Sequence, residues 1–100
     1  MRQFLFTLYV AGESPRSHQA AANLRRLVED WLGGGEYELT VVDVVREPQR
    51  AEEQRILTTP TLVKESPGPA RRVTGDLSDP GRVLAALALD PVRPGGQGTV

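Results

Sequence analysis

The chain has 100 residues, of which 39% are hydrophobic and 25% are charged, and its formal net charge is -1 at pH 7. These values are typical of one small globular domain. The net charge gives no indication of binding to nucleic acid or to an anionic membrane, because such binding needs many Lys and Arg side chains on one surface. The chain contains no cysteine, which excludes thiol–disulfide exchange, because a thiolate is the attacking group of that reaction.

The first expected strand runs from Phe4 to Val10, an apolar run interrupted by a single threonine. A run of this kind predicts a central strand that is covered on both faces. Ser14 and Pro15 then predict the start of a helix, with Ser14 as the N-cap and proline at the first helical position. Apolar residues recur at helical spacing as far as Trp31, and the three glycines at 33–35 are expected to end the helix.

A second strand is expected from Tyr37 to Val45, and its β-branched end predicts that it enters a buried layer. Strand, helix and strand in this order form a βαβ unit, in which the two strands are parallel. A short helical segment is expected from Pro48 to Leu57. Two further strands, Thr61 to Glu65 and Arg71 to Thr74, flank a turn of proline and glycine, so we predict an antiparallel hairpin.

The last helix is expected from Gly81 to Leu89, preceded by a Ser-Asp-Pro sequence that is typical of a cap. After residue 90 the composition changes to Pro, Gly, Gln and Thr, which is too polar to offset the entropy of ordering the chain. We therefore predict one domain over residues 1–90 and a disordered tail over residues 91–100.

The element order βαβ-α-ββ-α predicts a single α/β domain similar to thioredoxin. Thr59 and Pro60 lie between a helix-like and a strand-like segment, and thioredoxin-like domains have a cis-proline that faces the redox site at this junction. We predict a cis bond before Pro60. Because the chain has no cysteine, we expect it to act by binding. Another small α/β sandwich remains the alternative fold.

Candidate catalytic groups are few. His18 is the only histidine, and in the first turn of a helix we expect a solvated surface side chain. Ser14 occupies the place at which glutathione-using relatives of thioredoxin carry a catalytic Ser, Cys or Tyr, but N-capping explains it without catalysis. Glu52 and Glu53 are adjacent on a helix and point in different directions, so they form no acid–base pair. We predict no catalytic residue, no metal site and no cofactor.

Seven short segments form a distinctive series along the chain: Leu8-Tyr9-Val10-Ala11-Gly12, Ser14-Pro15, Val42-Asp43-Val44, Pro48-Gln49, Ala51-Glu52-Glu53, Ile56-Leu57-Thr58-Thr59-Pro60-Thr61-Leu62 and Arg71-Arg72-Val73-Thr74-Gly75-Asp76-Leu77-Ser78. In this order and register they resemble the KaiB family of small circadian-clock proteins, over residues 4–89. Each segment by itself is weakly diagnostic. Their joint order is highly specific.

The resemblance implies a non-enzymatic regulator that docks on KaiC, a hexameric RecA-like ATPase and autokinase, and modulates its phosphorylation cycle in a circadian clock, a timer or a stress response. It also implies a metamorphic protein. The partner-binding form is a thioredoxin-like monomer, and the resting form is a dimer or tetramer with a different second half. Some members sequester a second protein, KaiA, through a basic position in the first helix. That position is Ala20 here, so KaiA binding is not implied.

The resemblance places partner-binding residues on the second helix and the strands that follow it: Glu52, Glu53, Arg55, Lys64, Arg71 and Arg72. It assigns structural roles to Pro60, Gly75 and Asp76. No segment has the pattern of a signal peptide or of a membrane span, so we expect a cytoplasmic protein without a membrane partner.

Two alanines near the end of the chain bear on the choice between the two folds. Many clock KaiB proteins have Gly and Asp at the positions of Ala86 and Ala88. Both are expected inside the last helix, where alanine is the stronger helix former, so we predict a bias towards the thioredoxin-like form. The functional alternative is a non-redox thioredoxin-fold module that binds glutathione or a peptide at the groove beside Pro60.

Overall fold

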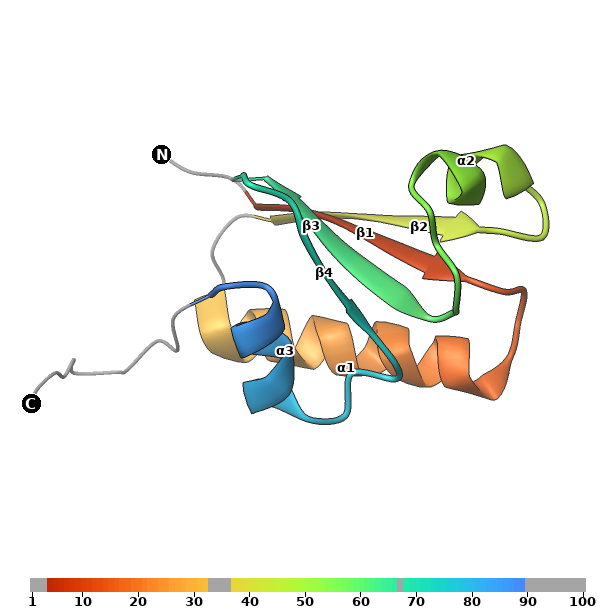
Figure 1. Cartoon of the computed structure of the whole chain (residues 1–100). Coiled ribbons are helices and arrows are strands. Elements are labelled where there is room, and N and C mark those ends of the chain that lie inside the picture. Colours follow the sequence, from red (N-terminus) through yellow and green to blue (C-terminus); the bar gives the residue numbers. More distant parts are fainter. Residues whose placement is uncertain (1–3, 33–36, 67, 90–100) are drawn as a thin grey trace, which may run out of the picture.

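The computed structural model describes residues 4–32, 37–66 and 68–89. In this part of the chain, strands and helices follow the predicted order (Figure 1): β1 (Phe4–Val10), α1 (Pro15–Leu32), β2 (Tyr37–Asp43), α2 (Pro48–Glu53), β3 (Thr61–Ser66), β4 (Arg71–Thr74) and α3 (Pro80–Ala86). The predicted glycine stop at 33–35 and the predicted tail at 91–100 lie outside the described residues.

The strands form one sheet in the order β2-β1-β3-β4. β1 is parallel to β2 and antiparallel to β3, and β3 pairs with β4 as the predicted antiparallel hairpin. The central place predicted for β1 is therefore confirmed. The burial predicted for the end of the second strand holds on one face only: Val42 is fully buried, whereas Val41 is half exposed. β2 is an edge strand and ends at Asp43, two residues earlier than predicted.

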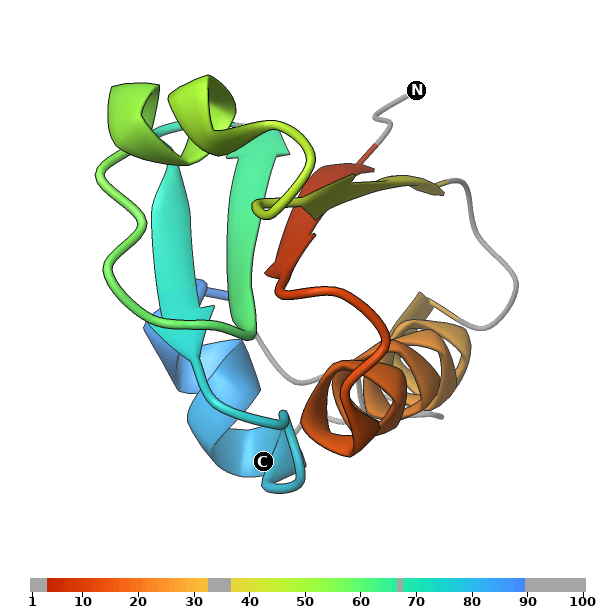
Figure 2. The same cartoon turned by 90° about the vertical axis from the view of Figure 1, so that its right-hand side faces the viewer.

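Helices α1 and α3 cover one face of the sheet, and α2 lies over the other (Figure 1; Figure 2). Successive side chains of a strand point to opposite faces. Phe6, Leu8 and Val10 of β1 therefore belong to the main core under α1 and α3, whereas Tyr9 belongs to a smaller cluster on the α2 side. The predicted burial of β1 on both faces is confirmed, and it explains the nearly continuous apolar run.

Helix α1 begins where the sequence predicts. The N–H of Ser17 donates to Ser14 Oγ at 3.2 Å, and the N–H of His18 donates to the Ser14 carbonyl at 3.1 Å. Ser14 is therefore the N-cap. Ala20 and Leu24 are fully buried on the side of α1 that faces the sheet, which fixes the orientation of the helix.

Both short helices end earlier than predicted. Helix α2 ends at Glu53, because the backbone of Arg55 turns into the left-handed region with a φ of 54°. The N–H groups of Arg55 and Ile56 then donate to the carbonyls of Glu52 at 3.1 Å and Ala51 at 2.9 Å. This pair of bonds is a Schellman motif, which closes a helix by satisfying its last carbonyl groups.

Helix α3 closes in the same way. It ends at Ala86, and Ala88 has a φ of 58°. The N–H groups of Ala88 and Leu89 donate to the carbonyls of Ala85 at 3.1 Å and Leu84 at 2.8 Å. The prediction that Ala88 strengthens the helix interior is wrong, because Ala88 lies beyond the helix in a conformation that disfavours any side chain. Ala86 is helical and keeps its predicted preference over glycine.

Candidate functional site

Hydrogen bonds hold the cis-proline region. The bond between Thr59 and Pro60 is cis, as predicted, and Pro60 is buried. The N–H of Gly75 donates to the Pro60 carbonyl at 2.9 Å, and the Thr61 hydroxyl donates to the Thr58 carbonyl at 2.6 Å. Gly75 has a φ of 106°, which glycine adopts at little steric cost. The bond from Gly75 ties the start of β3 to the end of β4, and the bond from Thr61 closes the turn before β3.

Asp76 connects the same region to α1. Its carbonyl accepts from Asn23 Nδ2 at 2.8 Å, and its Oδ1 accepts from the N–H of Ser78 at 3.1 Å. Hydrogen bonds from the hydroxyl and the N–H of Ser78 lower the pKa of Asp76, because they stabilise the carboxylate. Pro60, Gly75 and Asp76, the residues predicted to be structural, thus belong to one connected segment.

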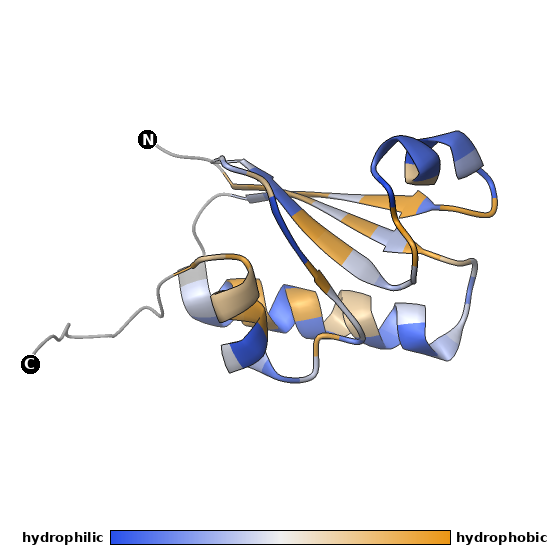
Figure 3. Ribbon diagram, viewed as in Figure 1, coloured by the Kyte–Doolittle hydropathy of each residue, from blue (hydrophilic) through white to orange (hydrophobic). Residues whose placement is uncertain are grey.

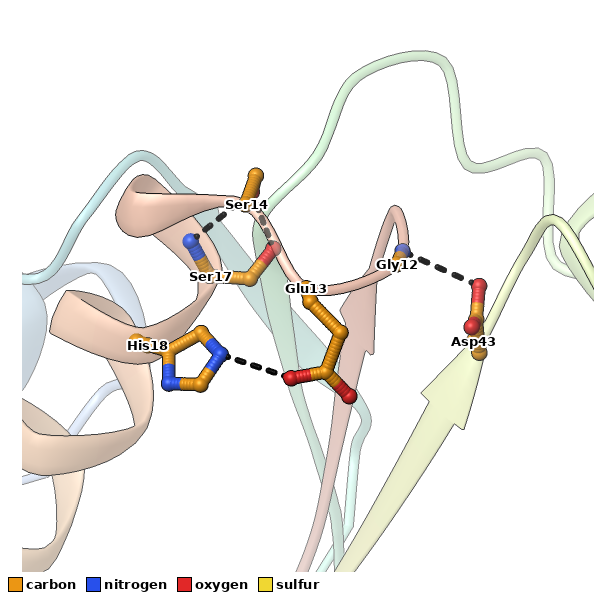
Figure 4. A network of polar contacts seen from close by, with 6 residues as sticks. All are labelled: Gly12, Glu13, Ser14, Ser17, His18 and Asp43. Atoms are coloured by element: carbon orange, nitrogen blue, oxygen red, sulfur yellow. Dashed lines mark hydrogen bonds and ion pairs between the residues drawn. The ribbon is translucent and has the colours of Figure 1, made fainter.

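A second carboxylate joins the loops at the ends of the parallel strands (Figure 4). Asp43 Oδ1 accepts from the N–H of Gly12 at 3.1 Å and from the N–H of Val45 at 2.9 Å. These bonds, of which the one from Val45 has the largest effect, lower the pKa of Asp43. The loop after β1 and the loop after β2 are therefore fastened to each other.

The two side chains considered for catalysis lie beside this junction. His18 Nε2 lies 2.9 Å from Glu13 Oε1 on the surface, and the Ser14 hydroxyl donates to Ser17 Oγ at 2.9 Å (Figure 4). His18 is a surface side chain and Ser14 is a helix cap, as predicted. Among the residues that the structure describes, no group of three or more His, Asp or Glu side chains is arranged to hold a metal ion.

A groove of about 550 Å³ lies between α1 and the free edge of β2. Its lining combines apolar and charged side chains: Val10, Gly12, Glu13, Ser17, His18, Ala21, Arg25, Val41, Asp43 and Arg46. The charges are partly paired, since Arg46 Nε lies 3.9 Å from Asp43 Oδ2. Neither Thr59 nor Pro60 lines this groove, so it is distinct from the position at which a cis-proline ligand is expected.

Helix α2 presents an exposed surface on the other side of the sheet. None of its residues is buried, and it is hydrophilic along most of its length (Figure 3). Two large apolar side chains flank it: Val45 is 71% exposed, and Leu57 is 92% exposed. Their neighbours Val44 and Ile56 pack inward against the Tyr9 cluster. We call residues 45–57 the α2 surface.

Four of the predicted partner-binding residues lie on this side of the sheet: Glu52, Glu53, Arg55 and Arg72. The first three are exposed on α2 or directly after it. Arg72 of β4 pairs in register with Val63, a member of the Tyr9 cluster. Its guanidinium reaches α2, because Nη2 donates to the Gln54 carbonyl at 2.8 Å and Nη1 donates to the Arg55 carbonyl at 3.1 Å.

Lys64 and Arg71 point to the opposite face. They pair in register with each other, and they alternate with Val63 and Arg72 along their strands. Lys64 is only 4% exposed and lies in register with Phe6 of the main core. Lys64, which the resemblance places among the partner-binding residues, is therefore not an exposed charge. Reversing its charge would act on folding, because it would bury a carboxylate in this place.

Charged side chains of α2, β3 and β4 act electrostatically on the phenol of Tyr9. Burial raises the pKa of Tyr9, and the carboxylate of Glu65 acts in the same direction. The guanidinium groups of Arg50 and Arg72 act against this rise. An arginine of α2 and an arginine of β4 thus both act electrostatically on Tyr9.

Comparison with known proteins identifies the family. Residues 7–89 match the model of the KaiB domain. The chain belongs to the KaiB family. The circadian clock protein KaiB3 of Synechocystis sp. (strain ATCC 27184 / PCC 6803 / Kazusa) is 43% identical over 91 residues, which cover 91% of this chain and 88% of that protein. The circadian clock oscillator protein KaiB of Synechococcus sp. (strain RCC307) is 49% identical over 89 residues, which cover 88% of this chain and 79% of that protein.

Solved structures confirm the thioredoxin-like fold of this KaiB-family chain. The N-terminal domain of Synechococcus elongatus SasA superposes with a TM-score of 0.73 at 26% identity, over 88% of this chain and 86% of that chain. Mitochondrial thioredoxin 3 of Saccharomyces cerevisiae superposes with a TM-score of 0.66 at 17% identity, over 88% of this chain and 79% of that chain. In the part of the chain that the structure describes, no helix is long and apolar enough to cross a membrane.

No role at this site was predicted from the sequence for Val45, Leu57 or Asp43. Val45 was predicted as the end of a strand and Leu57 as the end of a helix. Each is exposed beside an apolar residue that packs inward. The role of Asp43 could have been predicted from the sequence, because an aspartate at the end of a strand commonly accepts hydrogen bonds from a following turn. Ala20, which stands where some family members carry a basic residue, is fully buried in the core of this chain.

Proposed function

We propose that this KaiB-family chain is a non-enzymatic regulator that binds a KaiC-type hexameric ATPase in the cytoplasm and modulates its phosphorylation cycle. The observation that carries the proposal is the match of residues 7–89 to the KaiB domain, on a thioredoxin-like scaffold without cysteine. The names of its relatives refer to circadian clocks, which supports a clock role. A timer or a stress response would use the same docking step.

The α2 surface is the proposed docking site. Protein interfaces combine a few apolar anchors with a surrounding rim of polar and charged groups. Val45 and Leu57 offer exposed apolar anchors on either side of α2. Glu52, Glu53 and Arg55 add charges of both signs next to them. The matching surface of the ATPase should therefore carry an apolar patch and complementary charges.

The test is a titration of the chain against a KaiC-type hexamer in the presence of ATP. Arg55→Glu and Leu57→Ala should each weaken binding about tenfold or more, because they reverse a charge or remove an anchor in the α2 surface. Arg26→Glu makes the same charge change on an exposed part of α1 and should bind like the unmodified chain. Urea unfolding of all three variants should stay close to that of the unmodified chain, since these side chains are exposed.

Two results would contradict this assignment. Arg71→Glu tests the other face of the sheet, and weaker binding by Arg71→Glu with full binding by Arg55→Glu would remove the α2 surface from the docking site. A parallel titration with glutathione tests the competing class of function. If the chain binds glutathione and does not bind the hexamer, the result would instead support a non-redox thioredoxin-fold module that binds its ligand beside Pro60.

A further inference from the structure

Helix α2 is too short to be stable without contacts to the rest of the domain. It has six residues, whereas an isolated helix in water needs about 12–15 residues to be even marginally stable. None of its residues is buried, and Glu47, which precedes it, makes no side-chain cap. The position of α2 must therefore be set mainly by contacts at its ends and in the adjoining loops.

At the C-terminal end, β4 reaches across to the helix. The carbonyls of Gln54 and Arg55 accept from the two arms of the Arg72 guanidinium at 2.8 Å and 3.1 Å. A planar guanidinium suits two adjacent acceptors, and its positive charge complements the negative end of the helix dipole. Arg72 lies 18 and 17 residues along the chain from these two carbonyls. The hydrogen bonds are therefore tertiary links between two elements.

Arg72 is exposed to solvent, but its contacts within the chain agree with a positioning role. The strand register places it on the same face as Val63, in the small cluster that supports α2. Its charge also acts on the buried Tyr9 phenol, where it opposes the rise in the pKa of Tyr9 that burial causes. The guanidinium thus spans the space between β4 and α2, and both of its terminal nitrogens already donate to the chain.

We propose that Arg72 is a positioning residue that fixes α2 on the sheet and acts on partner binding through α2 instead of touching the partner. The inference rests on the proposed function only for its binding step. The link between β4 and α2 is a property of the isolated chain and is tested without any partner.

The first test is amide hydrogen exchange of the isolated chain by NMR. The reporters are the N–H groups of Gln54, Arg55 and Ile56, which close α2. Arg72→Ala should speed their exchange about tenfold or more, while the amide of Leu8 in the central strand changes much less. Arg26→Ala, which removes an exposed arginine from α1, should change neither set. Unchanged exchange at the three reporters in Arg72→Ala would overturn the proposal.

Arg72→Lys separates positioning from charge. Lysine keeps the positive charge but lacks the planar fork that serves two carbonyls, so exchange at the three reporters should lie between that of Arg72→Ala and that of the unmodified chain. If Arg72→Ala does not fold, the lysine variant decides the question by the same amides. Their exchange is faster if Arg72 fixes α2 and unchanged if it does not.

The same variants are then titrated against a KaiC-type hexamer. A positioning role predicts that affinity falls in step with faster exchange at α2, so that Arg72→Lys loses part of its binding. Full affinity of Arg72→Lys with faster exchange at α2 would overturn the action through α2, since the charge alone would then suffice. If the unmodified chain does not bind the hexamer, the proposed function fails, and the exchange data still decide whether Arg72 fixes α2.

Discussion

The two halves of the domain are built from different kinds of element. Residues 4–43 contain two seven-residue strands and an 18-residue helix. Residues 44–89 contain helices of six and seven residues. A long amphipathic helix gains both from its own propensity and from a wide buried stripe, whereas a helix of two turns depends on caps and on contacts with other elements. Local sequence thus supports the first half more strongly than the second.

The backbone shows the same difference. The first half uses Gly12, with a φ of 65°, where its chain turns into the left-handed region. Among the described residues, every non-glycine residue with a positive φ lies in the second half: Arg55, Leu77 and Ala88. A left-handed conformation costs such residues roughly 1–2 kcal/mol each. The second half is therefore held in this fold by contacts between elements, against part of its local preference.

This contrast agrees with the place that the KaiB resemblance implies for the fold switch. The metamorphism implied by the KaiB resemblance stays a prediction for this chain, and the second half is where we expect it. A region whose local preferences oppose its fold loses less when it is rebuilt in another way. The predictions below test this contrast between the halves.

The largest expected effect comes from truncating a buried leucine in each half. Leu24 of α1 and Leu87 after α3 are both buried, and replacement by alanine should lower the free energy of unfolding by about 2–5 kcal/mol in either place. Urea unfolding measures the loss in the free energy of unfolding. The control is Leu57→Ala at an exposed position, for which the loss should be about 0.5 kcal/mol or less. Leu87→Ala should speed amide hydrogen exchange in α3 more than in β1. An equal increase of the exchange rate in both elements would contradict the difference between the halves.

Two alanines at the end of α3 should give effects of opposite sign. Ala86→Gly should destabilise the thioredoxin-like form by about 1 kcal/mol, because Ala86 is helical. Ala88→Gly should stabilise it by about 1 kcal/mol, because Ala88 has a φ of 58°. Urea unfolding and NMR secondary shifts over residues 81–89 report both changes. Stability changes of the same sign in the two variants would refute this account of the helix end. Strand-like shifts in a dominant tetramer of the unmodified chain would refute it as well.

In the first half, the cap of α1 should matter more than the histidine beside it. Ser14→Ala should cost about 1 kcal/mol, because it removes the acceptor of the Ser17 N–H. His18→Ala removes only a surface contact with Glu13 and should change stability by about 0.5 kcal/mol or less. Thermal unfolding of the two variants checks the order. A larger loss for His18→Ala would show that the histidine has a role beyond the surface.

The smallest effect is a dependence of stability on pH in the acid range, with one carboxylate in each half. The pKa values of Asp43 and Asp76 are both lowered from the ordinary value of 3.8. The stabilisation is therefore fully present above that value and is lost as the pH falls through the lowered pKa. Both side chains are partly exposed, so the loss should be small. Asp43→Asn should flatten part of this acid dependence in urea unfolding between about pH 2 and 5, and an unaltered slope would contradict the assignment.

Features that depend on neighbouring residues alone were predictable from the sequence. The cap at Ser14 and the cap at Asp79, whose Oδ1 accepts from the N–H of Arg82 at 3.2 Å, follow from short patterns. The hairpin of β3 and β4 follows from two β-rich runs around a tight turn. The cis bond at Pro60 was predicted from its place in the fold, and the resemblance to KaiB depended on the order of short segments.

Only the tertiary structure decided which charges share a face and where the short helices end. Lys64 and Arg72 are both basic residues in the same hairpin, but the register of β3 and β4 sends them to opposite sides of the sheet. The left-handed conformations of Arg55 and Ala88 oppose local preference, so no local pattern predicts them. They persist because Ile56 and Leu87 pack into the two cores, and burial of these side chains offsets the cost in the backbone.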